Sequence, residues 1–137
     1  MKETKKFDEF LNYTFGQKEV SLAVINDLEE FEELSTSLQE KGFVEAKNDL
    51  DFFQNIRDKN NTFFFVTEGL PKKIYDIIVQ FPTGQIEIFD DKKMETQVIK
   101  PDRSELSVLI LLTEGSLKEI ENSGYFIIDK VGLTYRK

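Results

Sequence analysis

The sequence predicts an α+β fold, in which two or three N-terminal helices pack on one face of a mostly antiparallel sheet. In the first sixty residues, apolar side chains recur at helical spacing. From Thr62 onward they alternate with polar residues or form short continuous runs, which is typical of strands. Short polar segments separate these runs and are suited to reversing the chain. We therefore expect an antiparallel meander over about residues 62–99, followed by a strand, a helix and a strand.

The length and composition predict a single domain covering residues 1–137. A chain of this size can bury one core, and no repeat or Pro-, Gly- or Ser-rich linker divides it. Thirteen phenylalanines and no cysteines indicate that aromatic burial, not disulfides, stabilises the fold.

The first helix is expected over residues 3–14, where Phe7, Phe10 and Leu11 form an aromatic stripe. The alternating segment 20–25 predicts a short strand. Further along the chain, a helix is expected to begin after Asn48. Asn48 is its expected N-cap, and acidic residues follow in its first turn.

The most clearly marked element is a helix that follows Asn26. This residue is the expected N-cap, with Glu29 at the third helical position in a variant of the capping box. Lys41, Gly42 and Phe43 predict a Schellman ending. The expected buried stripe consists of Leu28, Phe31, Leu34 or Ser35, and Leu38.

Four strands are expected in the meander, at residues 62–67, 73–81, 85–90 and 94–99. Phe81 to Gly84 suits a type I turn with a left-handed glycine, and Asp90 to Lys93 suits a polar reversal.

The last third predicts a buried strand over residues 106–112, a helix over 116–123 and a strand over 125–130. Ser116 and Glu119 have capping-box spacing, and residues 133–135 could add a further short strand. The two main strands can be parallel or antiparallel, because the connection is just long enough for a crossover.

The composition excludes several catalytic classes. Without histidine or cysteine, the chain has no imidazole base, no thiolate nucleophile and no zinc-binding imidazole or thiolate. It contains no glycine-rich phosphate loop and no Gly-x-Ser-x-Gly motif. We therefore predict a non-catalytic interaction or regulatory module that requires no cofactor or metal.

The acidic helix is the candidate docking face of such a module. Between Asn26 and Glu40 the chain has six acidic residues and no basic one, so this helix holds −6 of the net charge of −8. Glu29, Glu30 and Glu33 are the candidate partner-binding residues, and the expected partner is a protein with a basic surface. The same pattern also fits a helix face that is simply solvated.

Other partners and locations follow from what the sequence lacks. Basic residues form no stripe, so direct nucleic-acid binding is not expected. No apolar run is long enough to span a bilayer, and the start has no apolar segment typical of a secretion signal. These features predict a cytoplasmic protein that does not bind membranes.

The alternative function is a divalent-metal-dependent phosphodiesterase or nuclease-like enzyme that uses Asp76, Asp90 and Lys92. Asp76 is expected on one strand and Asp90 at the end of the next, so that carboxylates could bind Mg²⁺ beside a lysine. Asp90 and Lys92 also fit an ordinary polar hairpin turn. A sensor of a small ligand is a third alternative, because pockets depend on packing and not on local sequence.

Overall fold

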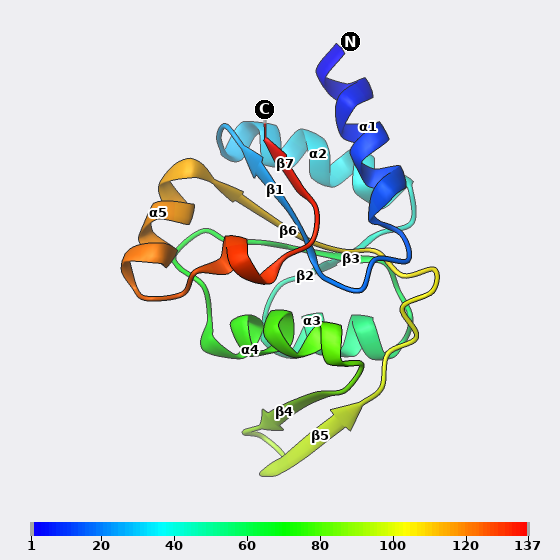
Figure 1. The fold of residues 1–137 in the computed structure, drawn as a ribbon, viewed down its shortest axis with the longest axis vertical. Helices are drawn as coiled ribbons and strands as arrows, with labels where there is room; N and C mark the ends of the chain where they lie inside the picture. The colour runs from blue at the N-terminus through cyan, green and yellow to red at the C-terminus, as the bar shows by residue number, and fades with distance from the viewer. Residues whose placement is uncertain (1, 137) are drawn as a thin grey trace.

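The computed structural model describes the backbone of residues 2–136 and the side chains of residues 6–136. Within this range the main sheet has five strands, all parallel, in the order β2-β3-β6-β1-β7 (Figure 1). The strands are β1 (Ser21–Ile25), β2 (Val44–Ala46), β3 (Thr62–Phe65), β6 (Val108–Thr113) and β7 (Thr134–Arg136). In the centre, Ala23 of β1 lies between Leu111 of β6 and Tyr135 of β7. The prediction of a mostly antiparallel sheet was wrong, and the fold is a mixed α/β arrangement.

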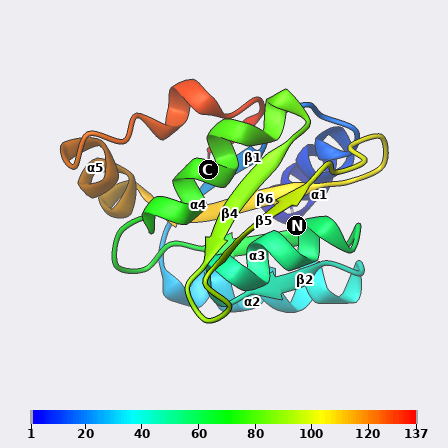
Figure 2. The same cartoon turned by 90° about the horizontal axis from the view of Figure 1, so that it is seen from below.

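Helices cover both faces of this sheet, as parallel neighbours require helical crossovers. They are α1 (Lys2–Thr14), α2 (Leu28–Glu40), α3 (Asp49–Arg57), α4 (Lys72–Gln80) and α5 (Glu114–Asn122). Buried side chains of α1 and α2 pack on one face, and those of α3, α4 and α5 pack on the other (Figures 1 and 2). The expectation that the N-terminal helices share one face was therefore wrong for α3.

The central strands contact both hydrophobic cores. In β6, Leu109 and Leu111 belong to the core under α1 and α2, whereas Ile110 and Leu112 belong to the core under α3, α4 and α5. A strand buried on both faces reads as a continuous apolar run. Such a run does not show in which direction the neighbouring strand points.

The only part of the predicted meander in residues 2–136 that forms antiparallel pairs is the hairpin of β4 (Ile86–Asp90) and β5 (Glu95–Ile99). These strands agree with the predicted segments 85–90 and 94–99, and Ile88 pairs with Gln97. The hairpin lies apart from the main sheet and packs on α4 (Figures 1 and 2). The predicted strand 62–67 is present as β3, but it pairs in parallel with β2 and β6.

The predicted strand over residues 73–81 is wrong, because this segment is helix α4. Its buried residues Ile74, Ile77 and Ile78 recur at helical spacing and continue to Phe81. The expected turn at Phe81 to Gly84 is present as part of the 3-10 helix η1 (Phe81–Thr83), in which the Gly84 amide donates to the Phe81 carbonyl at 3.2 Å. Gly84 has the predicted left-handed conformation, with φ of 80°.

The C-terminal prediction was correct for the first strand and for the helix, which form β6 and α5. Thr113 caps α5 by accepting a hydrogen bond from the Ser116 amide, so Ser116 is not the cap. The predicted strand 125–130 is wrong: it contains the 3-10 helix η2 (Ile127–Lys130) with Ile127 buried. The short strand at 133–135 is present as β7, which pairs with β1.

The predicted N-terminal elements are present, but the prediction missed strand β2 and was wrong at two positions of α2. Asp27, not Asn26, is its N-cap and accepts a hydrogen bond from the Glu30 amide at 2.9 Å. Leu28 is 57% exposed and lies outside the buried stripe. The Schellman ending is confirmed, since Gly42 has φ of 92° and the Phe43 amide donates to the Leu38 carbonyl.

None of the helices described within residues 2–136 is long and apolar enough to cross a lipid bilayer.

Candidate functional site

The strongest concentration of charge lies at one edge of the main sheet. Residues 27–58, which include α2, β2 and α3, hold ten acidic and three basic side chains, a net charge of −7 out of −8. β2 is the edge strand, and α2 and α3 both pack against it from opposite faces (Figure 2). We call this surface, residues 27–58, the acidic edge.

The outward side of α2 carries most of this charge. Glu29, Glu32, Glu33 and Glu40 are exposed, and their spacing places them on one side of the helix. Glu30 is half-buried, so the candidate face is better described by Glu29, Glu32 and Glu33. Asp27, Glu29 and Glu30 lie at the N-terminal end, where the helix dipole favours negative charge.

Two of the three basic residues in the acidic edge already have acidic partners. Lys41 pairs with Asp8 of α1 at 3.3 Å, and Arg57 pairs with Asp58 at 3.1 Å. Within residues 6–136, no lysine or arginine forms an ion pair with Glu29, Glu32 or Glu33. Glu29, Glu32 and Glu33 therefore present a negative field that no ion pair among residues 6–136 neutralises.

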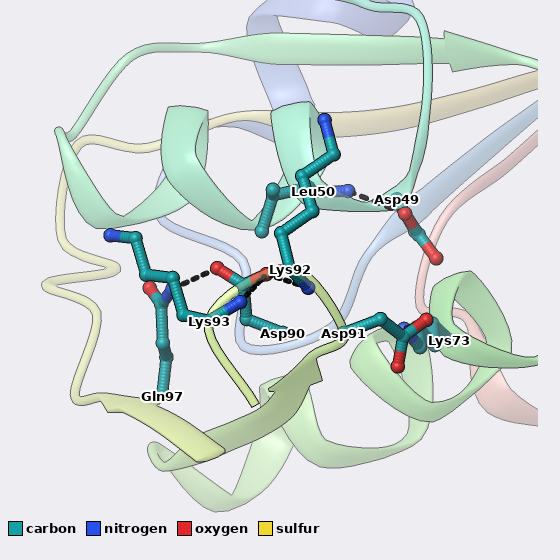
Figure 3. Close-up of polar contacts among 8 residues, drawn as sticks. All are labelled: Asp49, Leu50, Lys73, Asp90, Asp91, Lys92, Lys93 and Gln97. Atoms are coloured by element: carbon teal, nitrogen blue, oxygen red, sulfur yellow. Dashed lines mark hydrogen bonds and ion pairs between the residues drawn. The ribbon is translucent and has the colours of Figure 1, made fainter. Parts of the chain in front are cut away.

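Asp90 is the last residue of β4 and Lys92 lies in the turn that follows, and Asp90 has a structural role there (Figure 3). Asp90 is only 4% exposed. Its carboxylate accepts hydrogen bonds from the amides of Lys92 at 3.0 Å and Lys93 at 3.3 Å, and from the Gln97 side chain at 2.9 Å. The contact between Asp90 and Lys92 thus uses the lysine backbone and is the hydrogen bond of a polar turn.

A cavity of about 230 Å³ lies between this turn and the beginning of α3. Asp49, Leu50, Ile88 and Asp90 line it, together with Lys73, which forms an ion pair with Asp91 at 3.0 Å (Figure 3). Both signs of charge therefore meet in this cavity.

Asp76 lies elsewhere, because the segment predicted as its strand is helix α4. Its carboxylate pairs with Lys72 at 2.8 Å. The hydrogen bond and charge of Asp76 raise the pKa of Lys72 above its ordinary value. Asp76 borders a separate groove with Glu87 and Phe89. The structure therefore brings Asp90 and Lys92 together but places Asp76 outside their cavity.

The described part of the chain contains no group of three or more acidic residues arranged to hold a metal ion. The metal-dependent phosphodiesterase remains a prediction that rests on the sequence.

A larger cavity, of about 450 Å³, lies at the end of β3. It is formed by Phe64 and Phe65, the loop leading to α4, and Tyr125 after α5. In parallel α/β sheets, ligands bind at the carboxyl ends of the strands. This is the position that a small-ligand sensor would use, and local sequence could not reveal it.

Comparison with known proteins does not assign a function. The sequence matches no protein family model, and no curated protein is significantly similar to it.

Sequence reasoning missed two polar groups that organise the hairpin. Gln80 of α4 bonds to the backbone of β4, and Lys73 of α4 pairs with Asp91 of the turn. The helical spacing of Ile74, Ile77, Ile78 and Phe81 was the signal that could have identified α4. Once that helix is recognised, Lys73 lies in its first turn and Gln80 is its last residue.

Proposed function

We propose that this protein is a non-catalytic binding module, and that its acidic edge docks a basic surface of another protein. The observation that supports this proposal is that residues 27–58, which include α2, β2 and α3, carry −7 of the net charge of −8. On α2, the exposed residues Glu29, Glu32 and Glu33 have no ion-pair partner within residues 6–136.

The physical role of such a surface is mainly in association. Complementary charge accelerates encounter between two proteins and selects against partners of the same sign. Because these carboxylates are exposed, salt screens them, with a Debye length of about 8 Å at physiological ionic strength. Binding through the acidic edge should therefore weaken steeply as salt is added.

The test compares two variants with the same change in net charge. Glu29→Lys/Glu32→Lys/Glu33→Lys reverses the acidic edge. Glu68→Lys/Glu105→Lys/Glu119→Lys reverses three exposed charges outside residues 27–58. We expect affinity capture from a lysate of the native cells to give a stoichiometric basic partner with wild type and the control, but not with the first variant.

Both variants must first have the circular dichroism spectrum and unfolding transition of wild type. The affinity of the captured partner should then fall with increasing NaCl for wild type. A partner that the first variant retains with unchanged affinity would contradict the proposal.

A further inference from the structure

The β4–β5 hairpin has two outer edges, and the structure closes only one of them. Along β4, the Glu87 amide donates to Gln80 Oε1 at 2.9 Å, and Gln80 Nε2 donates to the Glu87 carbonyl at 3.2 Å. The side-chain amide of Gln80 thus bonds to β4 as the peptide group of a neighbouring strand would. The edge of β4 is therefore occupied by its own helix.

These two bonds also fix the orientation of the backbone in β5. Glu87 directs its N–H and C=O away from β5, so Glu87 and its partner Val98 are a non-hydrogen-bonded antiparallel pair. Val98 must then direct its own N–H and C=O away from β4. The same holds for Thr96, two residues earlier and opposite Phe89.

The edge of β5 is open. Within residues 2–136, no hydrogen bond reaches the backbone of Thr96 or Val98 from the side facing away from β4. No residue of β5 is fully buried, and the hairpin projects from the body of the molecule (Figures 1 and 2). Thr96 and Val98 therefore offer two donors and two acceptors to another strand.

Exposed apolar side chains and exposed lysines surround the edge of β5. Val98 is 49% exposed and Phe89 is 42% exposed, and both lie on the outer face of the hairpin. Lys92 and Lys93 precede β5 and Lys100 follows it, and all three are exposed. Within residues 6–136 none of these lysines forms an ion pair, and Glu95 is the one acidic residue of the strand.

We propose that β5 is a docking edge for an extended acidic segment of another protein. The segment adds a strand beside β5 by pairing with the backbone of Thr96 and Val98. Its apolar residues contact Val98 and Phe89, and acidic residues at its ends lie near the lysines. A second copy of this chain is a poorer occupant, because its β5 would bring the same lysines to the edge.

This docking edge is separate from the acidic edge, which belongs to the main sheet. Residues 86–100 carry four acidic and three basic side chains. The fit to an acidic segment therefore rests on the lysines at the two ends of β5, which form no ion pair within residues 6–136, and not on the net charge of the hairpin.

The experiment uses the full chain labelled with ¹⁵N and the probe peptide acetyl-Asp-Asp-Val-Thr-Val-Thr-Asp-Asp-amide. Binding is measured by titration, and amide hydrogen exchange is measured at each residue. We expect exchange at Thr96 and Val98 to slow when the peptide is bound. A peptide with Lys in place of each Asp should bind β5 about tenfold or more weakly, because each exposed charge pair adds up to about 1 kcal/mol. Its affinity for β5 is taken from the slowed exchange at Thr96 and Val98, because a basic peptide is also expected to bind the acidic edge.

Two variants test the backbone directly. Val98→Pro removes the outward N–H, which the hairpin does not use, and should weaken the Asp peptide about tenfold. Val98→Thr keeps the N–H and the branched side chain, and should bind like wild type. If the proline disturbs the hairpin, Lys100→Glu supplies the second test and should also lower the affinity.

Three results would overturn the inference. The first is absence of binding at millimolar peptide, or binding without slowed exchange at Thr96 and Val98. The second is equal affinity of the Asp and Lys peptides for β5, measured by the exchange at Thr96 and Val98. The third is a dimer, seen by sedimentation without peptide, in which exchange at Thr96 and Val98 is already slow.

Discussion

At the scale of single residues, Asp90 shows how a candidate catalytic carboxylate stabilises a turn. It is 4% exposed and accepts three hydrogen bonds, two of them from backbone amides of the turn. A hydrogen bond typically contributes about 1 kcal/mol net, and the donor residues Lys92 and Lys93 are exposed, so water can partly replace a lost acceptor. The fold of the hairpin thus depends on this side chain.

We predict that Asp90→Ala lowers the free energy of unfolding by about 2–3 kcal/mol, because it leaves the amides of Lys92 and Lys93 and the Gln97 side chain without their acceptor. Urea unfolding followed by circular dichroism measures the change. Asp91→Ala, at the exposed neighbouring position, should cost less than about 1 kcal/mol. Equal losses in the two variants would show that the three hydrogen bonds contribute little.

A second prediction concerns acid stability and Asp102. The backbone amide of Ser104 and the hydroxyl of Ser104 both donate to this carboxylate. These hydrogen bonds, the amide's being the larger cause, hold the pKa of Asp102 below its ordinary value of 3.8. A lowered pKa in the folded state contributes stability that is complete above pH 3.8 and is lost as pH falls through the lower value. Wild type should therefore be more stable than Asp102→Ala above pH 3.8, and this difference in the free energy of unfolding should disappear as the pH falls below the lowered pKa of Asp102.

The pKa itself can be followed by NMR titration of the Asp102 carboxyl carbon. Ser104→Ala removes the hydroxyl but keeps the amide, which is the larger cause of the shift. We expect this variant to raise the pKa only part of the way to the ordinary value. A complete return would assign the shift to the hydroxyl instead of the backbone.

At the scale of elements, Gln80 connects helix α4 to the hairpin. Its side chain makes two hydrogen bonds to Glu87, and α4 is the main element that β4 packs against. An isolated two-stranded hairpin is only marginally stable in water. The hairpin therefore depends on α4 for its position.

We predict that Gln80→Ala destabilises the protein by about 1–2 kcal/mol and accelerates hydrogen exchange at the Glu87 amide, which loses its acceptor. Gln85→Ala, which changes an exposed glutamine beside the same strand, is the matched control and should have little effect. Unchanged exchange at Glu87 in Gln80→Ala would contradict the role of Gln80 in closing the edge of β4.

The positions of most elements could be predicted from local sequence, but their pairing could not. Caps and endings identified α2 and α3, since Gly42 and Asn48 act through neighbouring backbone groups, and the aromatic stripe identified α1. Residues 73–81 were assigned the wrong period, although Ile74, Ile77 and Ile78 follow the helical one. The direction of β6 beside β1 depends on residues far apart in the chain, and no local pattern encodes it.

The candidate site could be predicted only in the part that lies on one helix. The run of glutamates in α2 was visible in the sequence, and the structure confirms that Glu29 and Glu33 are exposed. The contribution of β2 and α3 to the acidic edge required the parallel topology, which the sequence did not reveal. The prediction groups Asp76 with Asp90 because it places residues 73–81 on a strand, whereas they lie on helix α4.

At the scale of the whole molecule, the uneven distribution of charge destabilises the folded state. Carboxylates gathered on the acidic edge repel one another, and salt reduces this repulsion. We predict that adding about 0.5 M NaCl raises the free energy of unfolding by up to about 1 kcal/mol. Glu29→Gln/Glu32→Gln/Glu33→Gln should be more stable at low salt and gain less from added NaCl.

The corresponding variant outside the acidic edge, Glu68→Gln/Glu105→Gln/Glu119→Gln, removes the same charge from separate places. Its response to NaCl should stay close to that of wild type. If both variants lose the same part of the salt response, the repulsion depends on net charge and not on where the carboxylates lie.

The central position of β1 also has a consequence for how the protein folds. Leu22 pairs with Ile110 and Thr134, which lie 88 and 112 residues further along the chain. During synthesis, β1 is made before β6 and β7, so neither of its neighbours exists when it first emerges. Contacts between such distant segments slow the search for the native state. Refolding is therefore expected to be slow for a chain of this length, with an apolar strand left open to chaperones in the meantime.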